Sequence, residues 1–357
     1  MKMAESRHEI WFLRLEDNKM KCGTESLSDR IRLLNWESTQ TCATNVEACL
    51  HLVPELERIL KGVNPDLIHA GPVQSCGFMT ALTGFRPFLV MSWGSDILVD
   101  SEQSEMWRWT TRYTLRNSDM LLCDCQAVRT KVQELVSYEE ERIIQFPWGV
   151  DLLMFTPGVD HLGLRRNMGW EDKFIILCTR SWEQIYGIGT VLEAFDQAYS
   201  ANNRLRLIML GSGSLAPTIE RFISNHNLNQ VVHRPGMVRH EYVTNYFKAS
   251  DLYLSCSHSD GTSVSLLEAM ASGLPVVVTD GPGNREWVVS GENGWLAPAS
   301  DTRAFARKIL LAADLDRVAR RQICRSNRLK AEKRANWDVN FTKLLDAYEQ
   351  MEIQTTR

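Results

Sequence analysis

The stretch Ser257-His258-Ser259-Asp260-Gly261-Thr262-Ser263-Val264-Ser265-Leu266-Leu267-Glu268-Ala269-Met270-Ala271-Ser272-Gly273-Leu274-Pro275-Val276-Val277-Val278 decides the fold of this chain. Its pattern predicts the end of a strand, a turn, a short helix and a second strand. Gly261 permits the tight turn, and Gly273 followed by Pro275 ends the helix. The run 275–279 is too apolar for a half-exposed strand. We therefore expect a strand that is buried on both faces, as in a parallel sheet.

Two acidic residues bracket the turn, because Asp260 precedes it and Glu268 lies inside the helix, with seven residues between them. The first amides of a helix are unpaired donors at the positive end of its dipole, and they suit a phosphate group. Each carboxylate could then hold sugar hydroxyls beside that anion. An alternative follows from Ser265-Leu266-Leu267-Glu268, which matches the capping-box pattern. In that case Glu268 would only cap its own helix.

Length and composition narrow the class of protein. A chain of 357 residues predicts two domains, and a net charge of -4 gives no reason to expect nucleic acid as a partner. No apolar run reaches the ~18 residues that a membrane span needs, and residues 1–7 lack the apolar core of a signal peptide. The nine cysteines are scattered, which indicates free thiols in the cytoplasm. The close pairings Cys123-Asp124-Cys125 and Cys256-Ser257-His258 fall at the ends of predicted strands, and Asp314-Leu315-Asp316 lies in a predicted helical tail, so we expect no metal and no cofactor.

Strands and helices alternate along both halves of the chain. The pattern predicts strands over residues 8–15, 29–34, 66–69, 87–92, 119–123, 142–146, 174–179 and 205–210, and helices over 46–60, 105–116, 127–135, 187–198, 217–225 and 241–249. This alternation predicts an α/β fold with doubly wound parallel sheets. Pro157-Gly158 and the polar stretch after it mark a boundary. We expect a first domain over residues 1–156, a second over 157–336 and a final helix over 337–357.

The predicted helix over residues 105–116 mixes aromatic and basic side chains. Its aromatic residues interleave with arginines, in the order Trp107, Arg108, Trp109, Arg112, Tyr113 and Arg116. One interpretation is a helix that lies on a membrane surface. The other is a helix packed against the sheet with a solvated basic edge.

The central stretch resembles the signature of retaining glycosyltransferases of GT-B type that use nucleotide-diphosphate sugars, the group 1 and family 4-like glycosyltransferases. The segment Glu268-Ala269-Met270-Ala271-Ser272-Gly273-Leu274-Pro275-Val276-Val277 matches throughout, whereas Asp260 stands where Glu is commoner. Other motifs fall in the family's order: Pro65-Asp66-Leu67-Ile68-His69, Trp93-Gly94-Ser95-Asp96, Pro147-Trp148-Gly149-Val150-Asp151, Arg180, Gly211-Ser212-Gly213 and Pro235-Gly236. The resemblance covers residues 7–351.

The resemblance implies two Rossmann-like domains that face each other across a cleft, with the final helix crossing back to the first domain. It implies a metal-independent retaining transfer of a sugar from a UDP- or GDP-sugar to a glycan, lipid-linked or small-molecule acceptor. A cytoplasmic enzyme of this kind, with peripheral contact at the inner face of the membrane, is the expectation for localisation.

The same resemblance assigns residue roles. Arg180 would clamp the diphosphate, Asp260 would hold the donor sugar and Glu268 would hold the ribose. Further donor-binding positions are Gly211, Val238, Tyr186, Gly261, Thr262, Ser263, Val264 and Ser265. The acceptor-side positions are Trp93, Gly94 and Asp96.

Three departures from the family pattern affect the expected activity. Tyr186 stands where the family usually has a lysine, and Trp93 stands where many relatives have a histidine before Gly-x-Asp. Trp93 could stack on a sugar ring or simply pack in the protein. The third departure is Ser6-Arg7-His8-Glu9-Ile10, which resembles the opening of the family's second strand. We therefore expect the first domain to lack its opening β-α unit, which usually lies in the middle of the sheet. In the alternative, residues 8–15 serve as the first strand.

These departures favour a second interpretation, a GT-B protein that binds a nucleotide sugar but has little or no transfer activity. A nicotinamide dehydrogenase is a third interpretation. It is disfavoured because no Gly-x-Gly-x-x-Gly motif follows an early strand.

Overall fold

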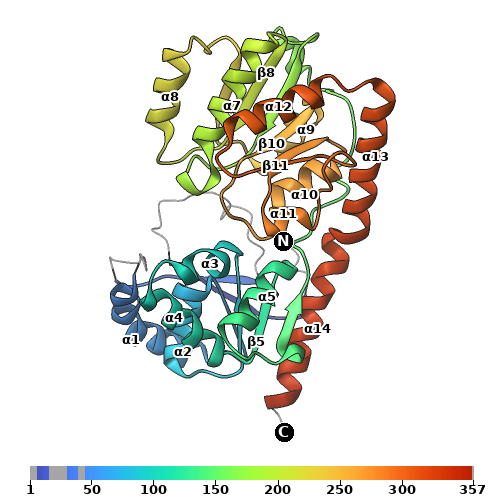
Figure 1. The fold of residues 1–357 in the computed structure, drawn as a ribbon. Coiled ribbons are helices and arrows are strands. Elements are labelled where there is room, and N and C mark those ends of the chain that lie inside the picture. Colours follow the sequence, from blue (N-terminus) through green and yellow to red (C-terminus); the bar gives the residue numbers. More distant parts are fainter. Residues whose placement is uncertain (1–5, 16–29, 39–44, 356–357) are drawn as a thin grey trace. The chain divides into compact units, whose positions relative to one another are not determined.

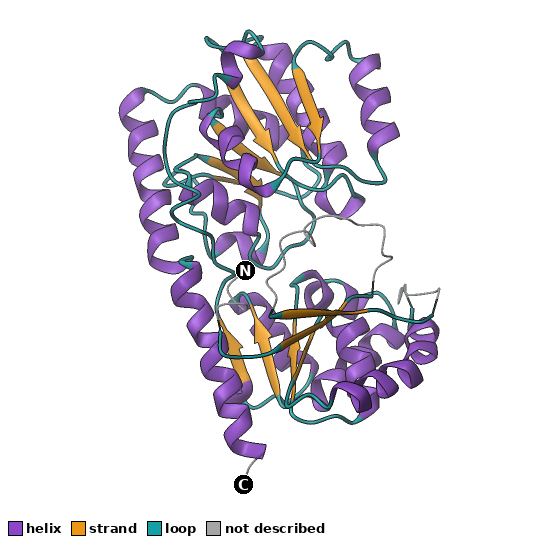
Figure 2. Cartoon of the chain, turned by 180° about the vertical axis from the view of Figure 1, so that it is seen from behind, coloured by secondary structure: helices purple, strands orange, loops and turns teal. Residues whose placement is uncertain are grey.

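The computed structural model describes residues 6–15, 30–38 and 45–355. Residue contacts divide the chain into two units, one formed by residues 1–146 with 338–357 and the other by residues 147–337. Each unit contains parallel strands with helices packed around them (Figures 1 and 2). The predicted fold class, two α/β units with parallel sheets, is confirmed, whereas the domain limits of the sequence analysis stay predictions.

The second unit is built on six parallel strands in the order β12-β11-β10-β7-β8-β9. The strands are β7 Phe174–Cys178, β8 Leu205–Leu210, β9 Val232–Gly236, β10 Leu252–Ser255, β11 Val276–Thr279 and β12 Trp295–Ala297. The chain begins with β7 in the middle, adds β8 and β9 on one side, and returns to add β10, β11 and β12 on the other. The order therefore reverses between β7 and β10. In open α/β sheets, ligands bind at the carboxyl ends of the strands beside such a reversal.

Helices cover both faces of this sheet (Figure 1). They are α6 Leu164–Asn167, η6 Gln184–Tyr186, α7 Ile188–Ala201, α8 Ala216–Asn225, α9 His240–Lys248, α10 Val264–Ala271, α11 Pro282–Arg285, α12 Thr302–Ala313 and α13 Arg317–Arg334. Alternate strand residues pack into two cores, one with α7, α8 and α12, the other with α9, α10 and α13. Every residue of β10 and β11 is buried, which explains their continuous apolar runs.

The stretch that opened the analysis folds as expected. The turn at Gly261 leads into α10, and Gly273 has a φ of 74°, the left-handed conformation that ends a helix and favours glycine. β11 follows, paired in parallel with β10. The predicted strand, turn, helix and buried strand are therefore confirmed.

The first unit contains a four-stranded parallel sheet in the order β3-β4-β5-β6, with β3 Ile68–Ala70, β4 Phe88–Met91, β5 Met120–Cys123 and β6 Ile143–Gln145. Its helices are α1 Val46–Val63, η3 Val73–Gly77, α2 Phe78–Thr83, α3 Ser95–Leu98, η4 Asp100–Glu102, α4 Glu105–Arg116, α5 Gln126–Leu135, η5 Glu140–Arg142 and α14 Trp337–Thr355. None of the helices in the described part of the chain is long and apolar enough to cross a membrane.

The remaining strands of the first unit form a separate pair, β1 Ile10–Leu13 with β2 Ile31–Leu34. Within the described ranges, β1 pairs with β2 alone and not with β3. The alternative in which residues 8–15 take the place of a central first strand is therefore wrong.

Candidate functional site

The carboxyl ends of β7 and β10 bring together segments that lie about eighty residues apart in sequence, as the bonds between Arg180 and the 260–265 segment show. Arg180 follows β7, and the turn with Asp260 and Gly261 follows β10. α10 begins at Val264 just after the turn, with Ser263 as its N-cap. The reversal in strand order thus places a cation, a carboxylate and a helix N-terminus at one point of the sheet.

Arg180 is the centre of this group. Its Nη2 lies 2.8 Å from Asp260 Oδ2. Its Nη1 donates to Ser263 Oγ at 2.6 Å and to Ser265 Oγ at 3.1 Å. The Ser265 hydroxyl lies 2.7 Å from the hydroxyl of Tyr253 on β10. Burial raises the pKa of the Asp260 carboxyl, and the charge of Arg180 opposes that shift.

The Tyr186 ring covers the guanidinium of Arg180. The guanidinium carbon lies 4.2 Å from the ring centroid, which is the geometry of a cation–π contact. The η6 turn that carries Tyr186 is tied to the segment after β10, because His258 N donates to Ile185 O at 2.8 Å. Gly187 ends this turn with a φ of 61° and passes so close to the chain that a Cβ there would meet Cys256 O at 2.0 Å. An aromatic ring therefore stands where the family resemblance expects a second cation.

Glu268 lies one turn into α10 and its side chain is only 10% exposed. Its Oε1 lies 3.2 Å from Nε2 of His240, the first residue of α9. The N-cap of α10 is Ser263, whereas Ser265 lies inside the helix and bonds to Arg180. The capping-box alternative is wrong for this reason, since it needs Ser265 at the N-cap and Glu268 three residues after it.

The remaining donor-side positions follow the carboxyl ends of β8, β9 and β10. Gly211 has a φ of 112°, and a Cβ there would lie 3.0 Å from the Arg180 carbonyl oxygen. Val238 lies half-buried in the loop between β9 and α9. Thr262 and Ser263 are buried at the start of α10. Their proximity fits one site, and their individual roles stay predictions.

The acceptor-side residues of the sequence analysis lie in the first unit. Asp96 is buried, and its carboxylate accepts from Ser92 Oγ and from the backbone amides of Trp93, Ile97 and Val73, at 2.7–3.0 Å. Asp96 therefore stabilises the conformation of its own loop, residues 92–97. Trp93 is 57% exposed, so its ring is not packed in the core.

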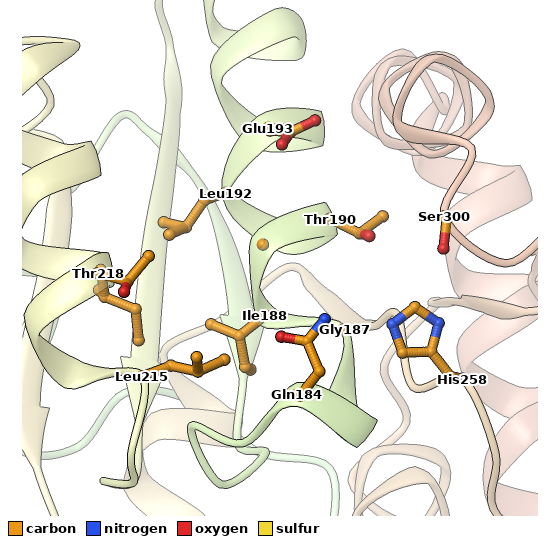
Figure 3. Close-up of a pocket in the computed structure, with 12 residues that line it drawn as sticks. Gln184, Gly187, Ile188, Thr190, Leu192, Glu193, Leu215, Thr218, His258 and Ser300 are labelled. Atoms are coloured by element: carbon orange, nitrogen blue, oxygen red, sulfur yellow. The ribbon is translucent and has the colours of Figure 1, made fainter.

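Figure 3 shows a cavity around the N-terminus of α7, with Gln184, Ile188 and Thr190 on one side and His258 near Ser300 on the other. Arg180, Asp260 and Glu268 do not line it. It is therefore separate from the group at the strand reversal.

Sequence reasoning missed two members of the site. His240 lies 28 residues before Glu268, and no spacing rule connects them. Tyr253 was expected only as part of a strand. Its position on β10, two residues before the strand ends at Ser255, is the signal that could have identified it.

Comparison with known proteins shows that two family models match this chain. The family model of glycosyl transferases group 1 matches residues 164–330, and the model of glycosyl transferase 4-like proteins matches residues 7–125. The D-inositol 3-phosphate glycosyltransferase of Xylanimonas cellulosilytica is 27% identical over 248 residues, 65% of this chain and 57% of that protein. The alpha-monoglucosyldiacylglycerol synthase of Streptococcus pneumoniae is 27% identical over 184 residues, 50% of this chain and 41% of that protein. The chain spans about half the length of the curated relatives it matches.

Solved structures share the fold. The sucrose-phosphate synthase of Thermosynechococcus elongatus superposes with a TM-score of 0.76 at 19% identity, over 91% of this chain and 84% of that one. Anabaena HepE, solved in complex with UDP and glucose, superposes with a TM-score of 0.75 at 19% identity, over 89% and 86% of the two chains.

Proposed function

The chain belongs to the group 1 glycosyltransferases of GT-B fold, and we propose that it transfers a sugar from a nucleotide-diphosphate donor with retention of configuration and without a metal ion. The observation that carries this proposal is the group of Arg180, Asp260 and the α10 N-terminus at the strand reversal. A diphosphate leaving group needs cationic and amide donors in place before the bond breaks. Arg180 and the first amides of α10 supply both.

In this proposal each acid has a separate task. Asp260 holds hydroxyls of the donor sugar, beside the amides of Thr262 and Ser263. The amides of Val264 and Ser265 face the diphosphate. Glu268 holds the ribose, and the backbone at Val238 faces the base. Arg180 already bonds to Asp260, so the sugar-binding and phosphate-binding groups are oriented together before the donor arrives.

The donor base is proposed to be uracil, with guanine as the alternative. The support is that the similar structure of Anabaena HepE contains UDP and glucose. The acceptor is proposed to be a glycan or a lipid-linked sugar.

The experiment is a thermal-shift panel of UDP, GDP, UDP-sugars and GDP-sugars, with and without EDTA. A ligand at a hundred times its Kd stabilises the protein by about 2.7 kcal/mol. We expect one nucleotide series to raise Tm by several degrees, equally with EDTA. Transfer to sugar or lipid acceptors, with the anomeric configuration of the product read by NMR, then tests retention. A protein that no nucleotide stabilises would contradict the proposal.

A binding protein with little transfer is the second candidate, and the stacking of Tyr186 on Arg180 favours it. The ring packs on Arg180, and in the family alignment proposed here it takes the position of a second phosphate-binding cation. Nucleotide-sugar binding without any transfer or hydrolysis, across a panel of acceptors, would select this candidate.

We also propose that the enzyme meets its acceptor at the cytoplasmic membrane surface through α4. Trp109 is 51% exposed and stacks on Tyr113 at 5.3 Å between centroids. A groove beside these rings is lined by Arg108, Arg112 and Arg116 together with Glu105, and Arg108 also pairs with Glu102. Arg112 and Arg116 therefore supply the charge that anionic lipids attract. Flotation with phosphatidylglycerol vesicles, but not with phosphatidylcholine vesicles, is expected to depend on Arg116. Unchanged flotation of Arg116→Glu would favour the packed helix with a solvated edge.

Glu268→Gln should weaken nucleotide binding while leaving the fold intact. Glutamine keeps the shape and can still accept a bond from His240, but it offers the ribose a neutral acceptor. We expect a loss of about 1.5–3 kcal/mol in nucleotide affinity by calorimetry, with Tm within a few degrees of the wild type. Glu220→Gln, on the exposed face of α8, is the control. Unchanged nucleotide affinity would remove Glu268 from the site.

Tyr186→Lys should tighten binding of the free nucleoside diphosphate. The new cation gains about 1.5–3 kcal/mol of charged hydrogen bonding, and loss of the stack on Arg180 costs about 0.5–1 kcal/mol. A net gain of roughly 1 kcal/mol is about fivefold in Kd. Tyr186→Phe keeps the stack and should bind like the wild type. If lysine gives no gain, Tyr186 does not occupy the family's lysine position.

A further inference from the structure

His240 and Glu268 form a pair that the family motifs do not include. His240 is the first residue of α9, and its Nε2 lies 3.2 Å from Glu268 Oε1. The two side chains differ in exposure, since the histidine is 67% exposed and the glutamate 10%. The exposed His240 ring therefore contacts the buried Glu268 carboxylate from the solvent side.

The His240 ring also contacts a second side chain. Phe155, which is buried, lies 5.5 Å away between ring centroids at an interplanar angle of 58°. The turn that carries Phe155 is closed by its amide, which donates to Asp151 O at 2.8 Å. The ring is thus fixed between a phenyl group and a carboxylate, and it restricts rotation of the Glu268 carboxylate.

This contact leaves one oxygen of Glu268 for a ligand. Among the residues that the structure describes, His240 is the one that donates to Glu268 Oε1, and none donates to Oε2. A carboxylate that binds the two hydroxyls of a ribose must present its free lone pairs in a defined direction. With Oε1 anchored, Oε2 has that direction before the ligand arrives.

We infer that His240 is a positioning residue that holds Glu268 Oε1, so that Oε2 is oriented toward the ribose of the nucleotide. This inference rests on the proposed function, because it takes Glu268 as the ribose-binding group. His240 does not itself touch the reacting atoms. It acts through the orientation of the carboxylate.

The pair also predicts a pH dependence of nucleotide binding. The charged groups on elements packed against His240 are Glu268 on α10 and Asp151 in the 151–155 turn, while Arg239 and Glu241 next to it pair with each other at 3.2 Å. The hydrogen bond that His240 donates to Glu268 raises the pKa of His240, against the effect of its partial burial. Below this raised pKa, Nε2 always carries a proton for Oε1. As pH rises through it, the ring loses one proton and its charge, the bond to Oε1 is no longer charge-assisted on the donor side, and affinity should fall.

The test is calorimetric titration of wild type and variants with UDP, or with GDP if the thermal-shift panel selects it. His240→Phe keeps a ring against Phe155 but removes the N–H, and it should weaken binding about three- to tenfold. His240→Gln restores a donor and should bind within about twofold of the wild type. In a Glu268→Gln background, His240→Phe should add little, because the carboxylate that His240 orients toward the ribose is already absent.

His226 offers a matched control. It stacks on Phe222 at 4.0 Å and its Nδ1 lies 2.7 Å from Asp196, so it combines the same two contacts on a surface of α8. His226→Phe should leave nucleotide affinity and its pH profile unchanged. Between pH 5.5 and 8.5 the wild type should lose affinity as pH rises, and His240→Gln should give a flatter curve.

The possible outcomes distinguish failure of the His240 inference from failure of the proposed function. If no nucleotide binds the wild type, both are wrong. If Glu268→Gln weakens binding but His240→Phe does not, Glu268 needs no anchor and the inference alone is wrong. An equal loss from His240→Phe with and without Glu268→Gln, or a pH profile that survives in His240→Gln, also overturns it.

Discussion

Arg180→Lys is expected to weaken binding of the nucleoside diphosphate by roughly 10- to 100-fold, although it keeps the charge. A guanidinium presents donors in a rigid fork, and in this protein the fork reaches Asp260 with one arm and Ser263 and Ser265 with the other. An ammonium group cannot hold both sides and a phosphate at once. Charge-assisted bonds of this kind are worth about 1.5–3 kcal/mol, which corresponds to the expected change in Kd.

The control for this change is Arg234→Lys. Arg234 forms the same kind of fork with Glu220, with both bonds at 2.7 Å, on α8 and β9 away from the strand reversal. Its replacement should leave nucleotide affinity unchanged. If Arg180→Lys binds nucleotide as well as the Arg234→Lys variant does, the diphosphate is held by the α10 amides alone, and Arg180 serves only to order the turn.

Sequence reasoning predicted best the helices and strands in which burial follows a regular pattern along the chain. β11 is apolar because both of its faces are buried, and α4 keeps a helical period because its threonine and leucine face is buried while its arginines are exposed. The predicted helix over 105–116 matches α4, and the predicted strand over 205–210 matches β8. Such patterns depend on which residues are buried, and the alternation of apolar and polar residue types in the sequence reflects this burial directly.

Contacts between distant segments were harder to predict. The bond from His240 to Glu268 depends on α9 and α10 lying on the same face of the sheet, and the stack of Tyr186 on Arg180 depends on the path of the η6 turn. The order of strands in the sheet decides which side chains meet. The periodic pattern of a sequence does not encode this order. The family motifs indicated which residues lie at the site. The residues that they contact could be identified only from the fold.

Gly283→Ala should destabilise the second unit and weaken nucleotide binding together, because α11 packs directly behind the turn that carries Asp260. A Cβ at Gly283 would lie 2.0 Å from Gly261 O and 3.1 Å from Asp260 O. The helix cannot easily retreat, since Asn284 Nδ2 donates to Thr279 O at 2.8 Å and ties it to the end of β11. The carbonyl of Gly261 must move instead.

The cost of this collision follows from the packing around it. Overpacking of a buried site costs about 1–3 kcal/mol, and each kcal/mol lowers Tm by about 2–4 °C for a domain of this size. A shift of roughly 1 Å at a positioned group can lower activity about 100-fold. Calorimetry for stability and nucleotide titration for affinity should therefore both change. Gly281→Ala, two residues earlier in the same loop, meets no atom within 4 Å and should change neither by much. If Gly283→Ala loses stability but keeps full nucleotide affinity, the position of Asp260 does not depend on the support behind it, and Arg180 alone orients that carboxylate.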